Sequence, residues 1–78
     1  MMTNLLKSFS FQKNKKNYSV AYIFKNEPKG NGLNLVVDVS VNDEAKITHT
    51  VNKPTATLYQ SNELIEKMIT DEIVLFAN

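Results

Sequence analysis

Alternating apolar and polar residues mark four segments of this chain as amphipathic β-strands. The clearest is residues 33–41, Leu-Asn-Leu-Val-Val-Asp-Val-Ser-Val, in which every odd position is aliphatic. Side chains alternate across a strand with period two, so one face of this strand is apolar and the other is polar apart from Val36. The same alternation over residues 5–13, 16–25 and 45–52 predicts a four-stranded sheet with one wet and one dry face.

Short connections fit these strands into an antiparallel meander that keeps the apolar faces together. The sequence predicts a two-residue turn at Asn14-Lys15, a second at Asn31-Gly32 and a three-residue loop at 42–44. A wider loop over 26–32 is the alternative for the second turn, because Pro28 disturbs a strand there. The predicted partners are Phe11 with Tyr18, Phe9 with Val20, Phe24 with Val39, Tyr22 with Val41, Val41 with Ala45 and Val39 with Ile47. A slip by one residue would invert a strand.

The last third of the chain predicts a helix. Pro54 ends the fourth strand, and residues 55–60 form either a short fifth strand or an extended approach. Ser61 is a good N-cap. Beyond Asp71 there are two alternatives: the helix stops there and residues 73–77 run extended, which we prefer, or the helix continues and Glu72 lies at its margin. Its apolar stripe is formed by Leu64, Ile65, Met68, Ile69 and Ile73. The fold prediction is therefore a single α+β domain over residues 1–78, a four- or five-stranded antiparallel meander with one C-terminal helix on its apolar face.

Size and composition limit the classes of function. A chain of 78 residues buries only about 60% of its unfolded surface, which leaves little room for a deep catalytic pocket. Cysteine is absent, so there is no disulfide and no thiolate ligand or nucleophile. No segment resembles a signal peptide or reaches membrane-spanning length, and we expect a cytoplasmic protein without membrane contact.

The residues that could act in catalysis or bind a metal are not brought together by the predicted strands and helix. His49 is the only histidine and lies on the apolar face, whereas Asp38 lies on the opposite face. The acidic pairs at 43–44 and 71–72 diverge, because neighbouring side chains point apart on a strand or helix. We therefore predict no catalytic residue, no metal and no cofactor, and a protein that is not an enzyme.

The polar face of the predicted sheet carries a small apolar island, which suggests a contact surface. The predicted register places Lys25 beside Asp38, and Val36 between Glu27 and Thr50. The candidate contact residues are Leu6, Ile23, Val36, Thr48 and Thr50. Aromatic residues of the opposite face are assigned to the core, since the helix must bury its stripe there.

This surface predicts a non-enzymatic accessory or inhibitor protein that binds a larger protein. The exposed fourth strand, by strand addition, and the tail at 73–76 are the alternative contacts with that partner. All nine basic residues are lysine and ten residues are asparagine, a composition of AT-rich coding sequences such as those of low-GC bacteria and their phages. A homodimer through an edge strand or the C-terminal tail is a further expectation, because a small core gains from added burial.

The alternative is binding of single-stranded nucleic acid through a lysine-rich hairpin tip. Its candidate residues are Lys13, Lys15, Lys16 and Tyr18. Four antiparallel strands and a helix, with Thr-Leu-Tyr-Gln-Ser-Asn-Glu-Leu at 57–64, resemble the strand-to-helix entry of single-stranded-DNA-binding domains of the transcriptional-coactivator and Whirly type. The basic balance of those domains is missing, since the net charge is +1, and no residue roles are transferred.

Overall fold

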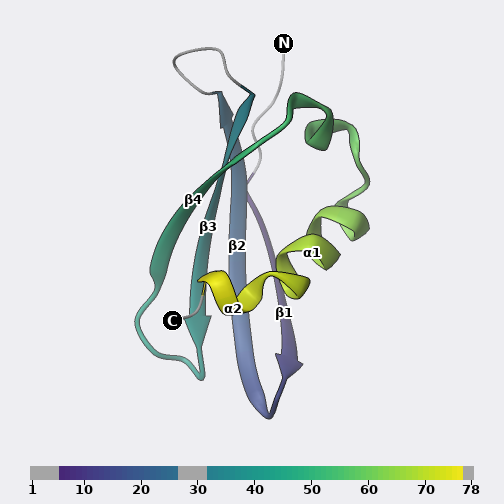
Figure 1. Ribbon diagram of the computed structural model, residues 1–78. Helices are drawn as coiled ribbons and strands as arrows, with labels where there is room; N and C mark the ends of the chain where they lie inside the picture. The colour runs from purple at the N-terminus through teal and green to yellow at the C-terminus, as the bar shows by residue number, and fades with distance from the viewer. Residues whose placement is uncertain (1–5, 27–31, 77–78) are drawn as a thin grey trace.

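The computed structural model describes residues 6–26 and 32–76 and confirms the predicted α+β architecture (Figure 1). The strands are β1 (Lys7–Lys13), β2 (Lys16–Asn26), β3 (Leu33–Val41) and β4 (Ile47–Lys53). They form an open antiparallel sheet in the order β1-β2-β3-β4. The 3-10 helix η1 (Thr55–Tyr59) and the helices α1 (Asn62–Asp71) and α2 (Ile73–Phe76) follow. Within the described ranges, no helix has the length and apolar character needed to cross a membrane.

The β1–β2 hairpin has the predicted turn and register. Asn14 and Lys15 both have positive φ, 53° and 65°, which is the conformation of a two-residue hairpin turn whose twist matches the strands. Phe9 pairs with Val20 and Phe11 with Tyr18, as predicted.

The β2–β3 register differs from the prediction by four residues. Tyr22 pairs with Val37 and Phe24 pairs with Leu35. A two-residue turn at 31–32 is therefore wrong, and the wider connection after Asn26 is correct, although residues 27–31 of that connection lie outside the described residues. Because the shift is even, every side chain stays on its predicted face.

Gly32, at the end of this connection, has no room for a side chain. Its φ is +84°, and a Cβ atom built on it would lie 2.5 Å from the carbonyl oxygen of Lys53. Glycine therefore lets the chain enter β3 directly against the end of β4.

The β3–β4 connection is longer than predicted. Val39 pairs with Ile47 as expected, but Val41 and Ala45 form no strand pair because β4 begins only at Ile47. Asn42 and its neighbour Asp43 have φ values of 50° and 62°, and the amide of Glu44 donates to the carbonyl of Val41 at 3.0 Å. This tight bend ends the ladder before Ala45 can join it.

The segment after β4 is helical where a strand or extended chain was predicted. Residues 55–59 form η1, in which the amide of Thr57 donates to the carbonyl of Pro54 at 3.0 Å and Thr57 is buried. The fifth-strand alternative is therefore wrong. Ser61 caps α1 as predicted, because its Oγ accepts from the Leu64 amide at 3.2 Å.

The chain also turns helical again after α1, so the extended course that we preferred for residues 73–77 is wrong over 73–76, and the alternative of one continuous helix is wrong at Glu72. The break after Asp71 is where we predicted it, with Glu72 as the C-cap. One helical turn places Ile73 and Phe76, three residues apart, on the same side, and both are buried against the sheet. An extended segment would have pointed one of them toward solvent.

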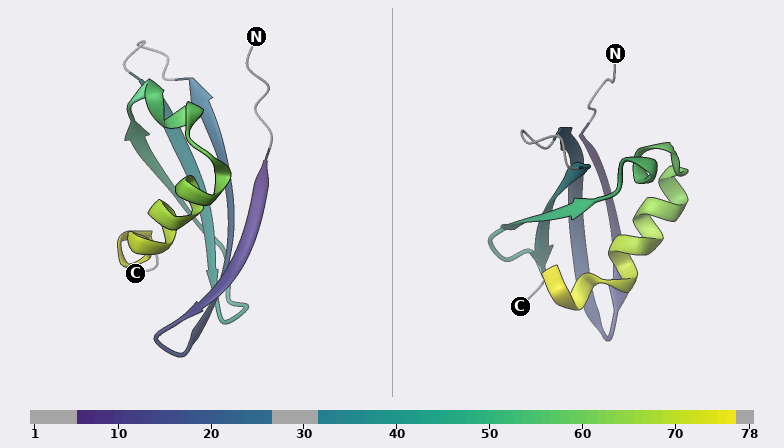
Figure 2. Two further views of the ribbon diagram at one scale, coloured as in Figure 1. Left: turned by 90° about the vertical axis from the view of Figure 1, so that its right-hand side faces the viewer. Right: turned by 45° about the horizontal axis from the view of Figure 1, so that its top comes forward.

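The helices cover one face of the sheet, and side chains from both elements form the core (Figure 2). The buried apolar residues are Tyr18, Val20, Tyr22, Phe24, Leu33, Leu35, Val37, Val39, Ile65, Ile69, Ile73 and Phe76. At about 1.5–3 kcal/mol for each large side chain, this burial is the main favourable term in folding. Leu64 does not belong to it: it is 55% exposed, so its predicted place in the buried stripe is wrong.

Polar contacts fix the helices over both edges of the sheet. Lys13 of β1 donates to the carbonyl of Thr70 at 3.2 Å, near the negative end of α1. At the other edge, Lys53 Nζ of β4 lies 3.3 Å from Glu72 Oε2 between α1 and α2. None of the described elements covers the opposite face of the sheet, and that bare face holds the candidate surface.

Candidate docking surface

The outer face is the side of the sheet turned away from the helices (Figures 1 and 2). On it, Ile23 of β2 pairs with Val36 of β3, which pairs with Thr50 of β4. Lys7 pairs with Tyr22, so Leu6 continues the same line beside Ile23. We call Leu6, Ile23, Val36 and Thr50 the apolar row. Ile23, Val36 and Thr50 lie side by side on β2, β3 and β4 at one level of the sheet, and Leu6 continues this level just before β1 begins.

The corrected register makes this row continuous. Val36 has Ile23 as its neighbour on β2, so its predicted place beside Glu27 is wrong. Leu6 is 65% exposed, and Ile23 and Val36 are half-buried although no element of the described ranges lies over them. The fifth candidate, Thr48, is exposed one level away, where its hydroxyl donates to Asp38 Oδ1 at 2.5 Å.

The expected neighbours Lys25 and Asp38 are also separated. Lys25 pairs with Asn34 on one side of the apolar row, whereas Asp38 pairs with Ala21 on the other side. The two charged side chains therefore lie on opposite sides of the row, and Asp38 forms no ion pair with any described lysine.

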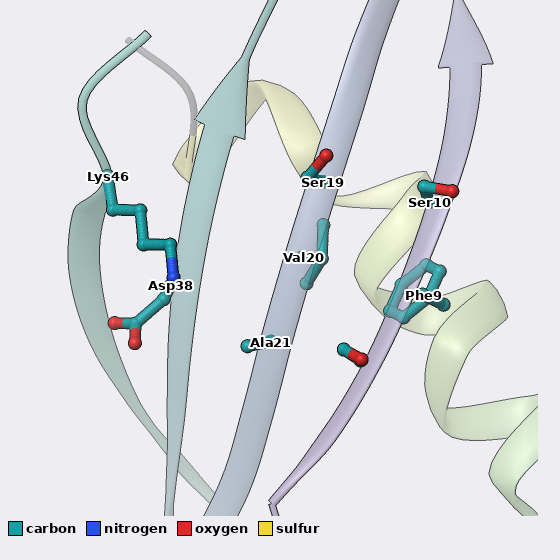
Figure 3. A pocket seen from close by; sticks show the side chains of 8 residues that line it. Phe9, Ser10, Ser19, Val20, Ala21, Asp38 and Lys46 are labelled. Atoms are coloured by element: carbon teal, nitrogen blue, oxygen red, sulfur yellow. The ribbon is translucent and has the colours of Figure 1, made fainter. Parts of the chain in front are cut away.

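A hollow of about 310 Å³ lies beside the apolar row (Figure 3). We call it the serine hollow; it is lined by Ser8, Phe9, Ser10, Ser19, Val20, Ala21, Asp38 and Lys46. Small side chains at neighbouring positions of β1 and β2 leave this space, because Ser8 pairs with Ala21 and Ser10 pairs with Ser19. Sequence reasoning missed the hollow, although the small residues at alternate positions of 8–10 and 19–21 are its signal.

The nucleic-acid candidates are placed less favourably for their predicted role. Tyr18 is only 6% exposed and its ring stacks on that of Phe11 at 5.0 Å, so it is not open to a base. Lys13 is bound to the end of α1, while Lys15 and Lys16 are exposed at the hairpin tip. Of the four predicted residues, only Lys15 and Lys16 are therefore exposed together. Among these four, no exposed aromatic side chain lies beside them on which a base could stack.

His49 lies in the core side of the sheet, away from the outer face. Its ring meets that of Phe76 edge-on at 5.6 Å between centroids, and its Nε2 is buried and has no hydrogen-bond partner among the described residues. Among residues 6–26 and 32–76, no three histidine, cysteine, aspartate or glutamate side chains gather to hold a metal ion. The geometry around His49 is that of a packed residue.

Comparison of the chain with protein-family models, with curated proteins and with solved structures finds no match. Among the described residues of the outer face, the apolar row is the feature that resembles the centre of a protein contact surface.

Proposed function

We propose that this protein is a non-enzymatic binding domain that docks on a larger protein through the outer face, as an accessory or inhibitor. The observation that carries the proposal is the apolar row, which runs across a sheet face that no described element covers. Aliphatic side chains at the centre of a patch and polar side chains around it are the usual anatomy of a protein interface.

The surroundings of the row support this proposal. Neutral side chains with one hydroxyl group, such as Ser8, Ser10 and Thr48, cost less to desolvate than charged ones. The face therefore suits a protein surface better than a phosphate backbone, which would need several cations.

Composition supports two finer parts of the proposal. A chain without cysteine suits a reducing compartment, so we place the protein in the cytoplasm. Its richness in lysine and asparagine suits a phage or mobile-element gene from an AT-rich host.

Affinity capture from a host lysate, followed by mass spectrometry, tests the proposal. We expect a reproducible protein partner that is lost with Ile23→Asp or Leu6→Asp, because a carboxylate would be buried unpaired at the interface. Leu64→Asp is the matched control, since Leu64 is an exposed leucine on the helix side. Equal capture by Ile23→Asp, Leu6→Asp and the wild type would reject the outer face as the docking surface.

Single-stranded nucleic acid remains the second proposal, supported only by the exposed Lys15 and Lys16 of the hairpin tip. It requires affinity that falls steeply with salt, because phosphate contacts release counterions. Recovery of nucleic acid alone in the capture experiment would reverse the ranking of the two proposals.

A further inference from the structure

We propose that the outer face also pairs with a second copy of this chain, around a two-fold axis that runs along the apolar row. In this dimer, Lys25 of each copy enters the serine hollow of the other and meets Asp38 there. The dimer rests on the proposed function only because it uses the same surface. Its formation is measured on the purified chain, without any other protein present.

The register of the sheet determines what such an axis brings together. A level is a set of outer-face residues that pair side by side across the strands. An axis along the apolar row brings that row against the same row of the second copy. It also brings the level on one side of the row against the second copy's level from the other side. One of these levels holds Lys25, Asn34 and Asn52, and the other holds Ser8, Ala21, Asp38 and Thr48. Lys25 and Ala21 both belong to β2, two residues on either side of Ile23, so Lys25 of one copy faces Ala21 of the second.

The serine hollow has room for this lysine and contains one carboxylate, that of Asp38, together with one lysine of the same chain, Lys46 (Figure 3). Ala21 and Ser19 from β2 leave the hollow open, and the carboxylate of Asp38 lies on the neighbouring strand (Figure 3). Adjacent strands lie about 4.8 Å apart and packed sheets about 10 Å apart, distances that a lysine side chain entering from the second copy can bridge. Thr48 holds one oxygen of Asp38, and no described lysine of the same chain pairs with this carboxylate.

Two-fold symmetry makes the contact twice. Each copy contributes one lysine and one hollow, so the dimer contains two equivalent Lys25–Asp38 pairs on either side of a central apolar stripe. This self-complementarity is the property that an isologous interface requires. Small residues around the stripe also allow two sheets to approach at the usual spacing.

The area of the face suits a weak dimer. The axis matches the apolar row and one level on each side of it, so four strands about 4.8 Å apart and three levels about 6.7 Å apart give a footprint of about 390 Å² on each copy. The two copies together then bury about 770 Å², which lies below the roughly 1,000 Å² of a stable interface and in the range of weak, transient contacts. We therefore expect exchange between monomer and dimer rather than a permanent dimer.

Sedimentation equilibrium of the purified chain tests the assembly. We expect the mass to rise from the 8.9 kDa monomer toward twice that value between about 1 and several hundred µM. Ile23→Asp should raise the dissociation constant at least about thirtyfold, because it places two carboxylates on the axis. Leu64→Asp on the helix side should leave it unchanged. A wild-type chain that stays monomeric over the whole range would overturn the inference.

A charge exchange tests the geometry of the dimer. Lys25→Asp and Asp38→Lys should each weaken dimerisation about three- to thirtyfold, because each turns two attractive pairs into two repulsive ones. The double variant K25D/D38K should return to within about threefold of the wild type, because both pairs form again with reversed signs. Additive losses in the double variant would rule out the axis along the apolar row.

The outcomes separate this inference from the proposed function. A monomeric chain that still captures a protein partner through Ile23 would overturn the dimer and leave the docking surface in place. A dimer whose Ile23→Asp variant captures the same proteins as the wild type would support the inference and contradict the proposed function.

Discussion

The hydroxyl of Tyr22 offers a quantitative test of how α1 seals the sheet. Tyr22 is 2% exposed, and its hydroxyl donates to Glu66 Oε2 at 3.0 Å. Burial, and after it the hydrogen bond and negative charge of Glu66, raise the pKa of Tyr22 to about 12. In the unfolded chain the pKa of a tyrosine is about 10. The folded protein thus holds this proton more tightly, so the linked stability is complete below about pH 10 and is lost as the pH rises toward 12.

The substitution Tyr22→Phe removes the titration and keeps the ring. At neutral pH we expect the wild type to be more stable by about 1 kcal/mol, the usual net value of a hydrogen bond. With pKa values of about 10 unfolded and 12 folded, the linked contribution falls by about 1.4 kcal/mol between pH 7 and pH 11. The difference between the two proteins should therefore shrink from about pH 10 and change sign near pH 11, where Tyr22→Phe becomes the more stable.

Urea unfolding followed by far-UV circular dichroism, at pH values from 7 to 11, measures this difference. The two proteins differ only in this one hydroxyl group, so the other contributions to the pH dependence of stability largely cancel in the comparison. Stability curves that remain parallel over the whole pH range would refute the buried Tyr22–Glu66 contact, and with it the placement of α1 over β2.

Three further substitutions test other parts of the fold by the same unfolding assay at pH 7. Ile69→Ala should cost about 2–5 kcal/mol because Ile69 is fully buried, whereas Leu64→Ala should cost less than about 0.5 kcal/mol; equal costs would contradict the orientation of α1. Ser61→Ala should cost about 1 kcal/mol through loss of the N-cap, and a cost near zero would exclude that cap. His49→Leu should stabilise the protein by about 1 kcal/mol because it removes a buried nitrogen for which the described part of the chain offers no partner, and marked destabilisation would show that this nitrogen is bonded.

The faces of the sheet could be predicted from the sequence because they depend only on whether a position is odd or even. Residues 33–41 have an aliphatic residue at every odd position, and the odd positions Leu35, Val37 and Val39 are buried as the pattern requires. The N-cap at Ser61 and the end of α1 near Asp71 follow from equally local chemistry. Prediction of the core therefore needed no knowledge of which strand residues face one another.

The helical turn of α2 could not be predicted in this way. The apolar run at 73–77 contains no polar position that would distinguish a helix from a strand. Phe76 contacts His49 and Ile73 is buried because α1 ends close to the sheet. The position of that end depends on the packing of the whole fold.

The outer face shows why the composition of a surface can be read from a sequence while its layout cannot. The prediction assigned the correct face to Ile23, Val36, Lys25 and Asp38. It gave the connection after Asn26 the wrong length. An error of four residues leaves the faces intact, since side chains alternate with period two, and yet it changes every neighbour across β2 and β3. The correct pairing joins Ile23 to Val36 and separates Lys25 from Asp38. Both the apolar row and the lysine available for a second copy therefore arise from the register, and they would disappear together if β2 and β3 paired around a two-residue turn.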